Sequence, residues 1–324
     1  MASPQIIVVG SFVQDLTFQC TEFPRPGETV IGQFLTGPGG KGSNQAVAAA
    51  RAGGEVAFIG AVGRDAFGAG ARAFQEGEGI RWLVTEKADR PTGAAGILVN
   101  AHGQNEIIVS LDANNALTPA DVEAHAEALR SATVLVTQLE ANLEAEAHAM
   151  RLAREGGATV IFNPAPMRPD FDPGLLADVD ILIPNETEFA ALMNILPKAR
   201  DRAGEGFDER KLEALPDEGL HALCRLLGVA TVIVTLGARG CFVSRQEGHA
   251  LIPAMRGIVA VDTTGAGDAF VGAFAVALAE LGVGEIEQAA RFANAGAALS
   301  VTRAGTAPAM PRRGEIDALL TKQG

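Results

Sequence analysis

The sequence predicts an α/β protein built on a doubly wound, mostly parallel sheet with helices on both faces. Two observations support this fold class. Several short runs are apolar throughout and do not alternate with polar residues, which is typical of parallel strands buried on both faces. Stretches with a helical pattern separate these runs, and such alternation predicts crossover helices that cover the sheet. The expected strands are 6–10, 56–60, 134–138, 159–163, 180–185 and 231–237, and the expected helices are 43–54, 65–77, 118–132, 143–157 and 186–196.

The helix expected at 118–132 has the clearest start signals. Thr118 is a favourable N-cap, Pro119 fits the first helical position, and Asp121 lies in the first turn. By contrast, residues 197–219 form a polar insert between two apolar segments. We interpret this insert as an excursion over the surface and not as a domain boundary.

Two stretches, 15–36 and 92–111, interrupt the alternation of strands and helices. Each has the pattern of a pair of strands, with turns at 24–28 (PRPGE) and 100–105 (NAHGQN). Because no crossover helix flanks them, we expect a small separate sheet that lies over the carboxyl ends of the main strands as a lid. Its other face would need a cover, which favours a homodimer formed through the lid. The expected organisation is one domain, 1–324, with a lid built from two insertions.

Charge and cysteine content limit the kinds of partner. A net charge of −13 argues against a nucleic-acid partner, because phosphate backbones select basic surfaces. No apolar run reaches the roughly 18 residues of a membrane span, so we expect no membrane association. The cysteines Cys20, Cys224 and Cys241 are far apart and lack the spacing of a metal site. They are typical of a reducing cytoplasm, which is where we expect the protein.

Residues 36–45, TGPGGKGSNQ, form the first of three glycine-rich loops. This loop matches neither the Walker A pattern nor the dinucleotide fingerprint. Glycines before a helix let the backbone approach a ligand closely, and Lys41 and Asn44 would be the polar groups there. An ordinary tight turn with a solvated lysine fits the residues equally well.

The second loop, GAGD at 265–268, leads into an apolar helix. The amides of Ala266, Gly267 and Asp268 would be free at this helix N-terminus, where the helix dipole favours an anion such as a phosphoryl group. An ionised Asp268 would be stabilised at the same place and would be able to accept a proton. A simple helix-capping role for Asp268 is the alternative.

Two further strand ends carry candidate polar groups. The turn 235–240, TLGARG, follows a strand and fits a nucleotide site, although such turns are common in α/β proteins. In 184–188, PNETE, Asn185 and Glu188 lie three residues apart on one helix face, where they would orient a hydrated Mg²⁺ ion and a phosphate. The same pair satisfies the pattern of a helix capping box.

These segments resemble the ribokinase family of carbohydrate kinases, and the resemblance covers nearly the whole chain. Each motif is a weak signal alone, but their joint order and spacing are specific. FPRPGET (23–29) and GGKGSNQAVAA (39–49) are most similar to the motifs of ribokinase itself. The motifs that carry the resemblance are GSFVQD, FPRPGETV, GGKGSNQAVAAARAGG, QLE, NPAP, PNETE, TLGARG, DTTGAGDAF and RFANAGAALSVTRAG.

The resemblance implies transfer of the γ-phosphate of ATP to the hydroxymethyl group of a sugar, D-ribose to D-ribose 5-phosphate in the most similar relatives. Asp268 matches the general base of the family, which contacts the sugar and removes the proton of the attacking hydroxyl. The sugar-contacting positions correspond to Val13, Asp15, Gly40, Lys41, Gly42, Asn44 and Glu140. The ATP-contacting positions correspond to Asn185, Thr235, Leu236, Gly237, Ala238, Arg239, Gly240, Ala266, Gly267 and Asn294.

The resemblance also implies two ions besides ATP. Glu188 matches the acid that organises Mg²⁺ through water. A monovalent cation, expected to be K⁺, would lie beside the GAGD loop and be held largely by backbone carbonyls. The positions that hold it correspond to Asp262, Thr264, Ser300, Arg303 and Gly305.

Three residues depart from the family pattern. Val13 stands where ribokinases usually have Asn, which removes one hydrogen bond to a sugar hydroxyl. A site that does not bond a hydroxyl discriminates weakly against a sugar that lacks it, so 2-deoxyribose becomes an alternative substrate. Asn294 replaces a His that is common near the adenine. Ala309 replaces a common Ser near the cation, which weakens the cation assignment.

The leading hypothesis is an active ATP-dependent pentose kinase, with 2-deoxyribose or another sugar or nucleoside as the alternative substrate. A non-catalytic sugar-binding relative is a hypothesis of another class. Such a relative would tolerate loss of Asp268 and of the neighbouring glycines, and all of them are present. A nicotinamide-dependent dehydrogenase does not fit, because the first strand runs into IIVVGSFVQD, with a single glycine where that class needs G-x-G-x-x-G.

Overall fold

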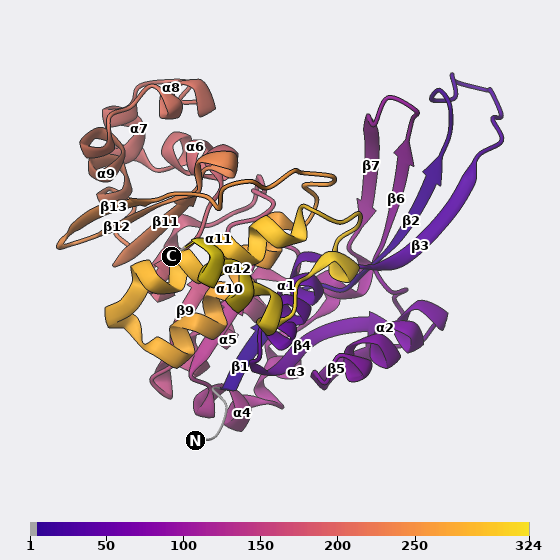
Figure 1. Cartoon of the computed structure of the whole chain (residues 1–324). Helices are drawn as coiled ribbons and strands as arrows, with labels where there is room; N and C mark the ends of the chain where they lie inside the picture. The colour runs from indigo at the N-terminus through magenta and orange to yellow at the C-terminus, as the bar shows by residue number, and fades with distance from the viewer. Residues whose placement is uncertain (1–4, 324) are drawn as a thin grey trace.

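The computed structural model describes residues 5–323, so the ends of the expected domain 1–324 lie outside the described chain. Two sheets organise the described residues, a main sheet of nine strands and a small sheet of four (Figure 1). The main sheet has the order β13-β12-β11-β10-β9-β8-β1-β4-β5. Its strands are β1 (Gln5–Val9), β4 (Glu55–Gly63), β5 (Arg81–Lys87), β8 (Val134–Thr137), β9 (Thr159–Phe162), β10 (Ile181–Leu182), β11 (Thr231–Thr235), β12 (Cys241–Arg245) and β13 (Gly248–Ile252).

The strand order predicts where a ligand site lies, at the carboxyl ends of the main-sheet strands. All neighbouring strands from β5 to β11 are parallel, whereas β12 pairs antiparallel with both β11 and β13. The chain passes from β1 outward to β4 and β5 and then returns to β8, on the other side of β1. Sheets of this kind bind ligands beside the carboxyl ends of the strands where the order reverses, which is here at β1.

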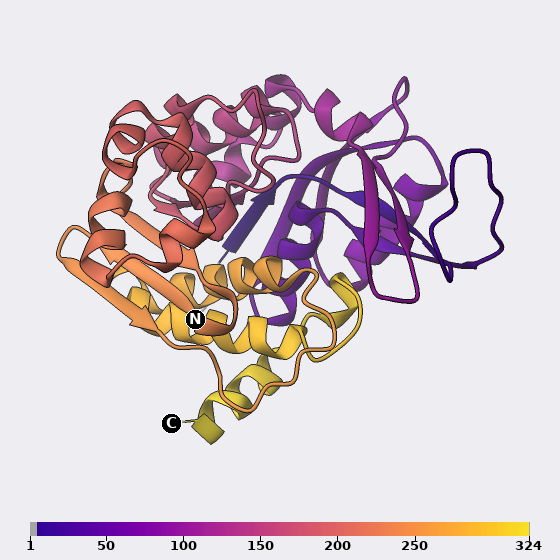
Figure 2. The ribbon, with the colours of Figure 1, turned by 90° about the horizontal axis from the view of Figure 1, so that it is seen from above.

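Helices cover both faces of the main sheet (Figure 2), and each face has its own apolar core. Ile7 and Val9 of β1 belong to the core under α3 to α9, while Ile6 and Val8 belong to the core under α1, α2 and α10 to α12. Alternate residues of one strand thus serve opposite faces, as expected for a buried parallel strand. The α-helices are α1 (Lys41–Arg51), α2 (Ala66–Gly77), α3 (Pro119–Glu123), α4 (Ala126–Ser131), α5 (Leu143–Glu155), α6 (Glu186–Ile195), α7 (Pro197–Ala203), α8 (Glu209–Glu213), α9 (Asp217–Arg225), α10 (Ala266–Leu281), α11 (Ile286–Ser300) and α12 (Arg313–Gln323). Five 3₁₀ helices lie at Asp112–Ala116, Pro173–Asp178, Gly237–Arg239, Val283–Glu285 and Ala307–Ala309.

The predicted fold class is confirmed, and every predicted strand overlaps a strand of the main sheet. The segment 180–185 contributes only the two residues of β10. The prediction lacks β5, β12 and β13 because these strands mix polar with apolar residues. β5 and β13 lie at the two edges of the sheet and are half-buried or exposed along most of their length.

The helix predicted at 118–132 is wrong in one respect, because it is divided into α3 and α4. His125 leaves the helical backbone region between them (φ −116°, ψ 20°). The predicted start is confirmed: Thr118 and Asp121 form a capping box, in which the Thr118 side chain accepts from the Asp121 amide and the Asp121 carboxylate accepts from the Thr118 amide. The insert 197–219, which we expected to be an excursion over the surface, contains regular structure. It forms α7, α8 and the start of α9 and buries Ala199 and Leu212.

The two predicted strand pairs form the small sheet, in the order β3-β2-β6-β7. The hairpins β2–β3 and β6–β7 are antiparallel, and β2 joins them by pairing parallel to β6. β2 begins four residues after β1 ends, so the small sheet rises from the carboxyl edge of the main sheet (Figure 1). The strands are β2 (Val13–Gln19), β3 (Gln33–Gly39), β6 (Ala94–Val99) and β7 (Asn105–Ser110).

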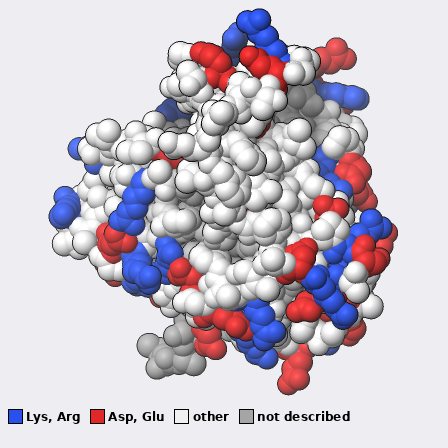
Figure 3. Space-filling view, turned by 90° about the vertical axis from the view of Figure 1, so that its right-hand side faces the viewer, with Lys and Arg blue, Asp and Glu red and all other residues white. Residues whose placement is uncertain are grey.

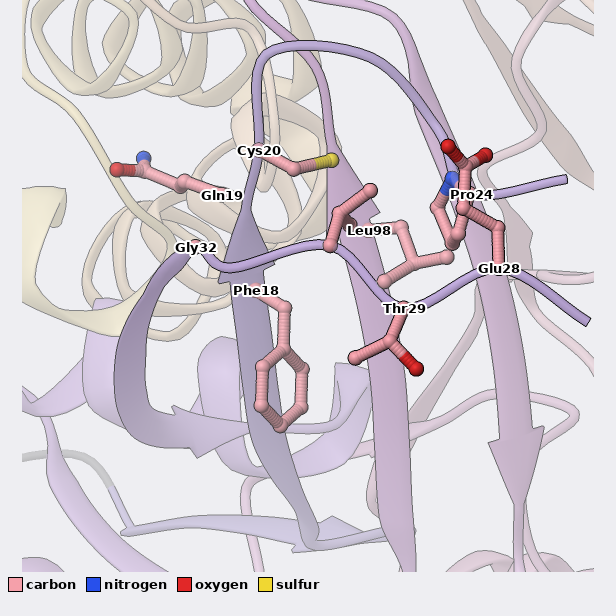
Figure 4. Close-up of a pocket in the computed structure, with 9 residues that line it drawn as sticks. Phe18, Gln19, Cys20, Pro24, Glu28, Thr29, Gly32 and Leu98 are labelled. Carbon is pink, nitrogen blue, oxygen red and sulfur yellow. The ribbon is translucent and has the colours of Figure 1, made fainter.

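The small sheet exposes large apolar side chains. Figure 3 views the side of the molecule that carries it, and the middle of this surface lacks charged residues, which lie around its rim. The exposed apolar residues of the small sheet and its 20–32 connection are Phe18, Val30, Ile31, Phe34, Leu35, Ile107, Ile108 and Val109. A pocket of about 260 Å³ lies beneath that connection, with Phe18, Cys20 and Leu98 in its wall (Figure 4). Among residues 5–323, no helix is long and apolar enough to cross a bilayer.

Candidate active site

The predicted base lies where two helices touch. Asp268 is in the first turn of α10, is 6% exposed, and faces the first turn of α1. Asn44 Nδ2 donates to Asp268 Oδ2 at 3.0 Å, and Gln45 Nε2 donates to Asp268 Oδ1 at 3.0 Å. The two helices approach closely at Gly272, where a Cβ would lie 2.5 Å from both Ala48 Cβ and the Gln45 carbonyl oxygen. This packing brings together residues that are more than 220 positions apart.

Opposing influences act on the Asp268 carboxyl. Burial raises its pKa, while the charge of Lys41 and the hydrogen bonds from Gln45 and Asn44 lower it, and the net effect is a raised pKa. A buried carboxyl group that accepts a hydrogen bond on each oxygen and forms no ion pair among residues 5–323 is suited to accept a proton. A simple capping role is insufficient, since its oxygens accept from α1 and not from its own helix.

Glu140, in the loop after β8, closes the N-terminus of α1. The N-cap of α1 is Gly40, which has no side chain to accept from the helix amides. Glu140 Oε2 accepts from the Lys41 amide at 2.8 Å and from Ser11 Oγ at 2.7 Å. A carboxylate at this end of a helix also complements the helix dipole. Glu140 therefore fixes the start of α1 while its half-buried carboxylate stays beside the predicted sugar position.

Lys41 is the cation of this cluster. Burial lowers its pKa, but the charges of Asp268, Glu140 and Glu188 raise it more, so the net pKa is raised and the ammonium stays charged. Asp15 of β2 is half-buried nearby, and burial together with the charge of Glu140 raises its pKa to about 6. The predicted sugar position is thus surrounded by carboxyl groups with one ammonium among them.

The glycines of the first loop serve the packing of the chain itself. Gly40 has φ 87°, and a Cβ there would lie 2.7 Å from the Val13 nitrogen. A Cβ at Gly42 would lie 2.6 Å from the Ser11 nitrogen. The glycines were predicted to let the backbone approach a ligand, and in the described residues they let it approach the connection between β1 and β2. Val13 itself is buried, with 3% of its surface exposed.

The predicted nucleotide positions gather at the ends of β10 and β11. Asn185 and Thr235 form a parallel bridge, and the Thr235 amide donates to the Pro184 carbonyl at 2.9 Å. The turn that follows is exposed at Gly237, Ala238 and Arg239, whereas Leu236 and Gly240 are buried. Asn294 lies apart from them, because its Nδ2 donates to the carbonyls of Ile252 and Pro253 at 3.1 and 3.2 Å. That amide holds α11 against the segment after β13.

The amides of the GAGD loop differ from the prediction in one position. The Ala266 amide is not free, because it donates to the Thr263 carbonyl at 3.2 Å within the turn. The amides of Gly267 and Asp268 donate to no acceptor among residues 5–323. The predicted anion site therefore has two free amides at the N-terminus of α10.

Asn185 and Glu188 form the capping box that the sequence left as an alternative. Glu188 Oε2 accepts from the Asn185 amide at 2.9 Å, Glu188 Oε1 accepts from Asn185 Nδ2 at 3.0 Å, and Asn185 Oδ1 accepts from the Glu188 amide at 2.8 Å. Burial raises the pKa of Glu188 to about 7. Each carboxylate oxygen keeps a free lone pair, so the pair fits a magnesium ion held through water.

Asp262 ties the GAGD turn to the loop after α11. Its Oδ1 accepts from the Thr264 amide and its Oδ2 from the Gly305 amide, both at 2.9 Å. Although burial opposes it, these hydrogen bonds lower the pKa of Asp262. The side chains of Ser300 and Arg303 turn away, to the Ala297 carbonyl and to Glu315. A cation here would therefore be held by backbone carbonyls, in a loop whose shape Asp262 fixes.

The structure also brings polar residues to Asp268 to which the sequence assigned no role. They are Gln45, Gln138 and Asn163, all of which are buried. Each stands in a motif that carries the resemblance, directly after Asn44, at the start of QLE and at the start of NPAP. A polar residue at the end of an apolar strand is the signal that would have found Gln138 and Asn163.

Three comparisons with known proteins agree with this geometry. Residues 3–313 match the model of the pfkB family carbohydrate kinases. The chain is 35% identical to a deoxyribokinase of Salmonella typhi, covering 94% of this chain and 95% of the relative, and 36% identical to a ribokinase of Haemophilus influenzae, covering 96% of both. The structure of an Arabidopsis thaliana ribokinase complexed with ribose and ATP superimposes with a TM-score of 0.81 at 31% identity, covering 99% of both chains. The chain therefore belongs to the pfkB family of carbohydrate kinases, phosphotransferases with an alcohol group as acceptor.

Proposed function

We propose that this carbohydrate kinase transfers the γ-phosphoryl group of ATP to the hydroxymethyl group of a pentose, with D-ribose as the first candidate. One observation carries the proposal: the buried carboxylate of Asp268 lies at the N-terminus of α10, close to the charged Lys41 and to two free backbone amides. A proton acceptor and an anion site at one point are what phosphoryl transfer to a hydroxyl requires.

In the proposed reaction, Asp268 accepts the proton of the sugar hydroxymethyl group while its oxygen bonds to the γ-phosphorus and the bond to the β-phosphate oxygen breaks. The amides of Gly267 and Asp268 stabilise the charge on the transferred group. Lys41 and the half-buried carboxylates of Asp15 and Glu140 hold the sugar. The buried Asn44 Oδ1 accepts from no donor among residues 5–323, and it would bond a sugar hydroxyl.

ATP would lie along the turn 235–240 and beside Asn185. Bound Mg²⁺ neutralises the phosphate charges. Glu188 and Asn185 would hold it through water. The loop joined by Asp262 and Gly305 would hold a monovalent cation, for which K⁺ is our candidate. Ala266 and Asn294 would contact ATP without donating hydrogen bonds to it. The backbone amide of Ala266 and the side-chain amide of Asn294 already donate to backbone carbonyls.

A second candidate substrate is 2-deoxyribose, and Val13 is the observation that favours it. This buried valine begins β2 beside Gly40, and it has no group to bond a sugar hydroxyl. An apolar wall gives little preference for a hydroxyl over a hydrogen. The relatives named above include both a ribokinase and a deoxyribokinase at similar identity.

A coupled ATP-turnover assay over ribose, 2-deoxyribose, fructose and adenosine tests the proposal. We expect the highest kcat/KM with ribose or 2-deoxyribose. A preference for fructose or adenosine would contradict the proposed substrate class. Absence of turnover with every sugar would favour a non-catalytic sugar-binding protein.

The small sheet is proposed to act as a lid and to join two copies of the chain. Apolar side chains on its exposed face would be covered in a homodimer, and the rim of charges in Figure 3 would surround the interface. Light scattering after size-exclusion chromatography should give a dimer for the wild type and a monomer for Ile108→Glu. Val283→Glu, an exposed apolar position away from the small sheet, should stay dimeric. A monomeric wild type would overturn this assembly.

A further inference from the structure

A chain of buried side-chain amides lies behind Asp268, and the proposed roles do not use it. Gln45 and Gln138 are completely buried, and Asn163 is 8% exposed. Gln138 Nε2 donates to Gln45 Oε1 at 2.8 Å, and Gln45 Nε2 donates both to Asn163 Oδ1 and to Asp268 Oδ1 at 3.0 Å. The chain therefore runs from β8 and β9 through α1 to the predicted base on α10.

A backbone carbonyl sets the direction of every bond in this chain. Asn163 Nδ2 donates to the Ile183 carbonyl at 2.8 Å, and a carbonyl only accepts. The Asn163 amide is thereby fixed with Oδ1 toward Gln45. If the Gln45 amide were turned over, its oxygen would face both Asn163 Oδ1 and the Asp268 carboxylate, and two buried hydrogen bonds would become repulsive contacts. Gln45 can therefore only donate to Asp268.

A fixed donor has two consequences for a carboxylate. A side chain that only donates stabilises the charged form of Asp268 over the protonated form, because the protonated oxygen would meet an N–H group. The bond from Gln45 to Oδ1 and the bond from Asn44 to Oδ2 also define the plane of the carboxylate. The Asn44 amide has no comparable lock, since its Oδ1 has no partner among the described residues.

We infer that Gln45 is a positioning residue for phosphoryl transfer, which the amides of Gln138 and Asn163 hold so that it keeps the Asp268 carboxylate in one orientation as proton acceptor. The inference rests on the proposed function of Asp268. Among residues 5–323, the Gln45 side chain forms a hydrogen bond to Asp268 and none to the predicted sugar contacts Asp15 or Glu140, so its loss should slow the reaction and leave sugar binding nearly unchanged.

Gln75 of α2, which lies outside the chain of amides, is a matched control. Gln75 is completely buried, like Gln45, and its Nε2 donates to Ser43 Oγ at 2.8 Å, two residues from Gln45 on the same helix. No bond in the described residues links Gln75 or Ser43 to Asp268. Gln75→Leu therefore introduces the same substitution at the same depth and disturbs the same helix without touching the predicted base.

The experiment compares pH profiles of kcat, with saturating ATP, Mg²⁺ and sugar, for the wild type, Gln45→Leu, Gln138→Leu and Gln75→Leu. Other charged groups surround Asp268: Lys41 of α1, Glu140 after β8, Glu188 of α6 and, beside Glu140, Asp15 of β2. They are present in all four proteins, so a difference between the variants and Gln75→Leu isolates the amide chain. Thermal melting checks that each variant is folded.

We expect Gln45→Leu to move the acid limb of the kcat profile upward by about one pH unit and to lower kcat about 10- to 100-fold at neutral pH, with the KM for the sugar within about threefold of the wild type. Gln138→Leu should move the acid limb in the same direction by a smaller amount. If Gln45→Leu does not fold, Gln138→Leu tests whether the amide chain positions Asp268. Gln75→Leu should match the wild type.

Two outcomes separate failure of this inference from failure of the proposed function. If Asp268→Asn is inactive but Gln45→Leu and Gln138→Leu keep the acid limb and kcat of the wild type, Asp268 is the base and Gln45 does not position it. If Asp268→Asn retains near-normal turnover, the proposed function of Asp268 is wrong and the inference is lost with it. Equal shifts in Gln45→Leu and Gln75→Leu would indicate a disturbance of α1 alone, and would also overturn the inference.

Discussion

The two halves of the candidate site are built differently. On the sugar side, Val13, Asn44 and Asp268 are buried, and Asp15, Lys41 and Glu140 are half-buried. On the nucleotide side, Asn185, Gly267 and the turn 237–239 are exposed. The sugar side is held by side-chain hydrogen bonds between distant elements, whereas the nucleotide side consists mainly of backbone at strand ends.

This difference indicates that the folded chain pre-organises the sugar side more than the nucleotide side. Burial on the sugar side strengthens each charge interaction, because the surroundings are less polar than water. It also raises the pKa of Asp15 and Asp268. We therefore expect substitutions on the sugar side to change catalysis and stability strongly, and substitutions on the nucleotide side to change mainly the binding of ATP.

The two acids beside the GAGD turn give the largest expected effect. Asp268→Asn removes the proposed proton acceptor and should lower kcat about 10²- to 10⁴-fold while sugar binding, measured by calorimetry, changes little. Asp262→Asn, the matched acid on the nucleotide side, should have a smaller effect on kcat and should mainly raise the KM for ATP, because it loosens the link to Gly305. Near-normal turnover of Asp268→Asn would remove the assignment of the base.

Two glycines with left-handed backbone provide the next test. Gly40 has φ 87° and Gly237 has φ 53°, so an alanine costs roughly 1–2 kcal/mol of backbone strain at either position. A Cβ at Gly40 would also collide with the backbone of Phe12 and Val13, whereas a Cβ at Gly237 would meet no atom within 4 Å. Gly40→Ala should lower the Tm markedly and abolish activity. Gly237→Ala should lower the Tm by only a few degrees, from the backbone strain alone, and raise the KM for ATP a few-fold. Equal losses in both variants would contradict the contrast between the two sides.

Asp15 links stability to pH on the sugar side. Burial and the charge of Glu140 raise its pKa from 3.8 to about 6 in the folded chain. The resulting stabilisation is complete below about pH 4 and is lost as the pH rises through about 6. Asp15→Asn should therefore be more stable than the wild type at pH 7.5, by up to about 3 kcal/mol, and equally stable at pH 4. The KM of Asp15→Asn for the sugar should rise. A melting temperature equal to that of the wild type at pH 7.5 would argue against a raised pKa of Asp15.

Val13 carries the smallest expected effect, which concerns the choice of sugar. Val13→Asn would supply an amide to a sugar hydroxyl and should raise the ratio of kcat/KM for ribose over 2-deoxyribose about 3- to 10-fold. Val13→Ala, which changes the volume without adding a donor, is the control and should leave the ratio within twofold. If the ratio stays constant in Val13→Asn, this position does not contact the distinguishing hydroxyl.

Patterns within one segment were predicted more reliably than contacts between segments. Thr118 was predicted as an N-cap with Asp121 in the first turn, and a capping box was the alternative for Asn185 and Glu188. Both pairs form capping boxes. Glycines 40 and 42 were predicted to let the backbone approach a ligand, but the sequence does not contain the information that the β1–β2 connection packs against them. Edge strands such as β5 were missed because their half-buried residues lack the apolar pattern.

The amide chain behind Asp268 illustrates why part of the site escaped prediction. Gln45, Gln138 and Asn163 come from three elements, and the direction of their bonds depends on the Ile183 carbonyl of a fourth. Sequence spacing cannot supply that geometry. The same limit applies to the Ala266 amide, which the turn itself occupies, and to Asn294, whose amide bonds the backbone of β13 and its following residue.

The position of the phosphate on the product tests the central claim most directly. The wild-type protein is incubated with ATP, Mg²⁺ and ribose or 2-deoxyribose labelled with ¹³C, and the ¹³C–³¹P coupling identifies the phosphorylated carbon. We expect the phosphate on the hydroxymethyl carbon, formed at least about 10²-fold more slowly by Asp268→Asn under the same conditions. Phosphate on the anomeric carbon, or product formed by Asp268→Asn at the rate of the wild type, would contradict the account.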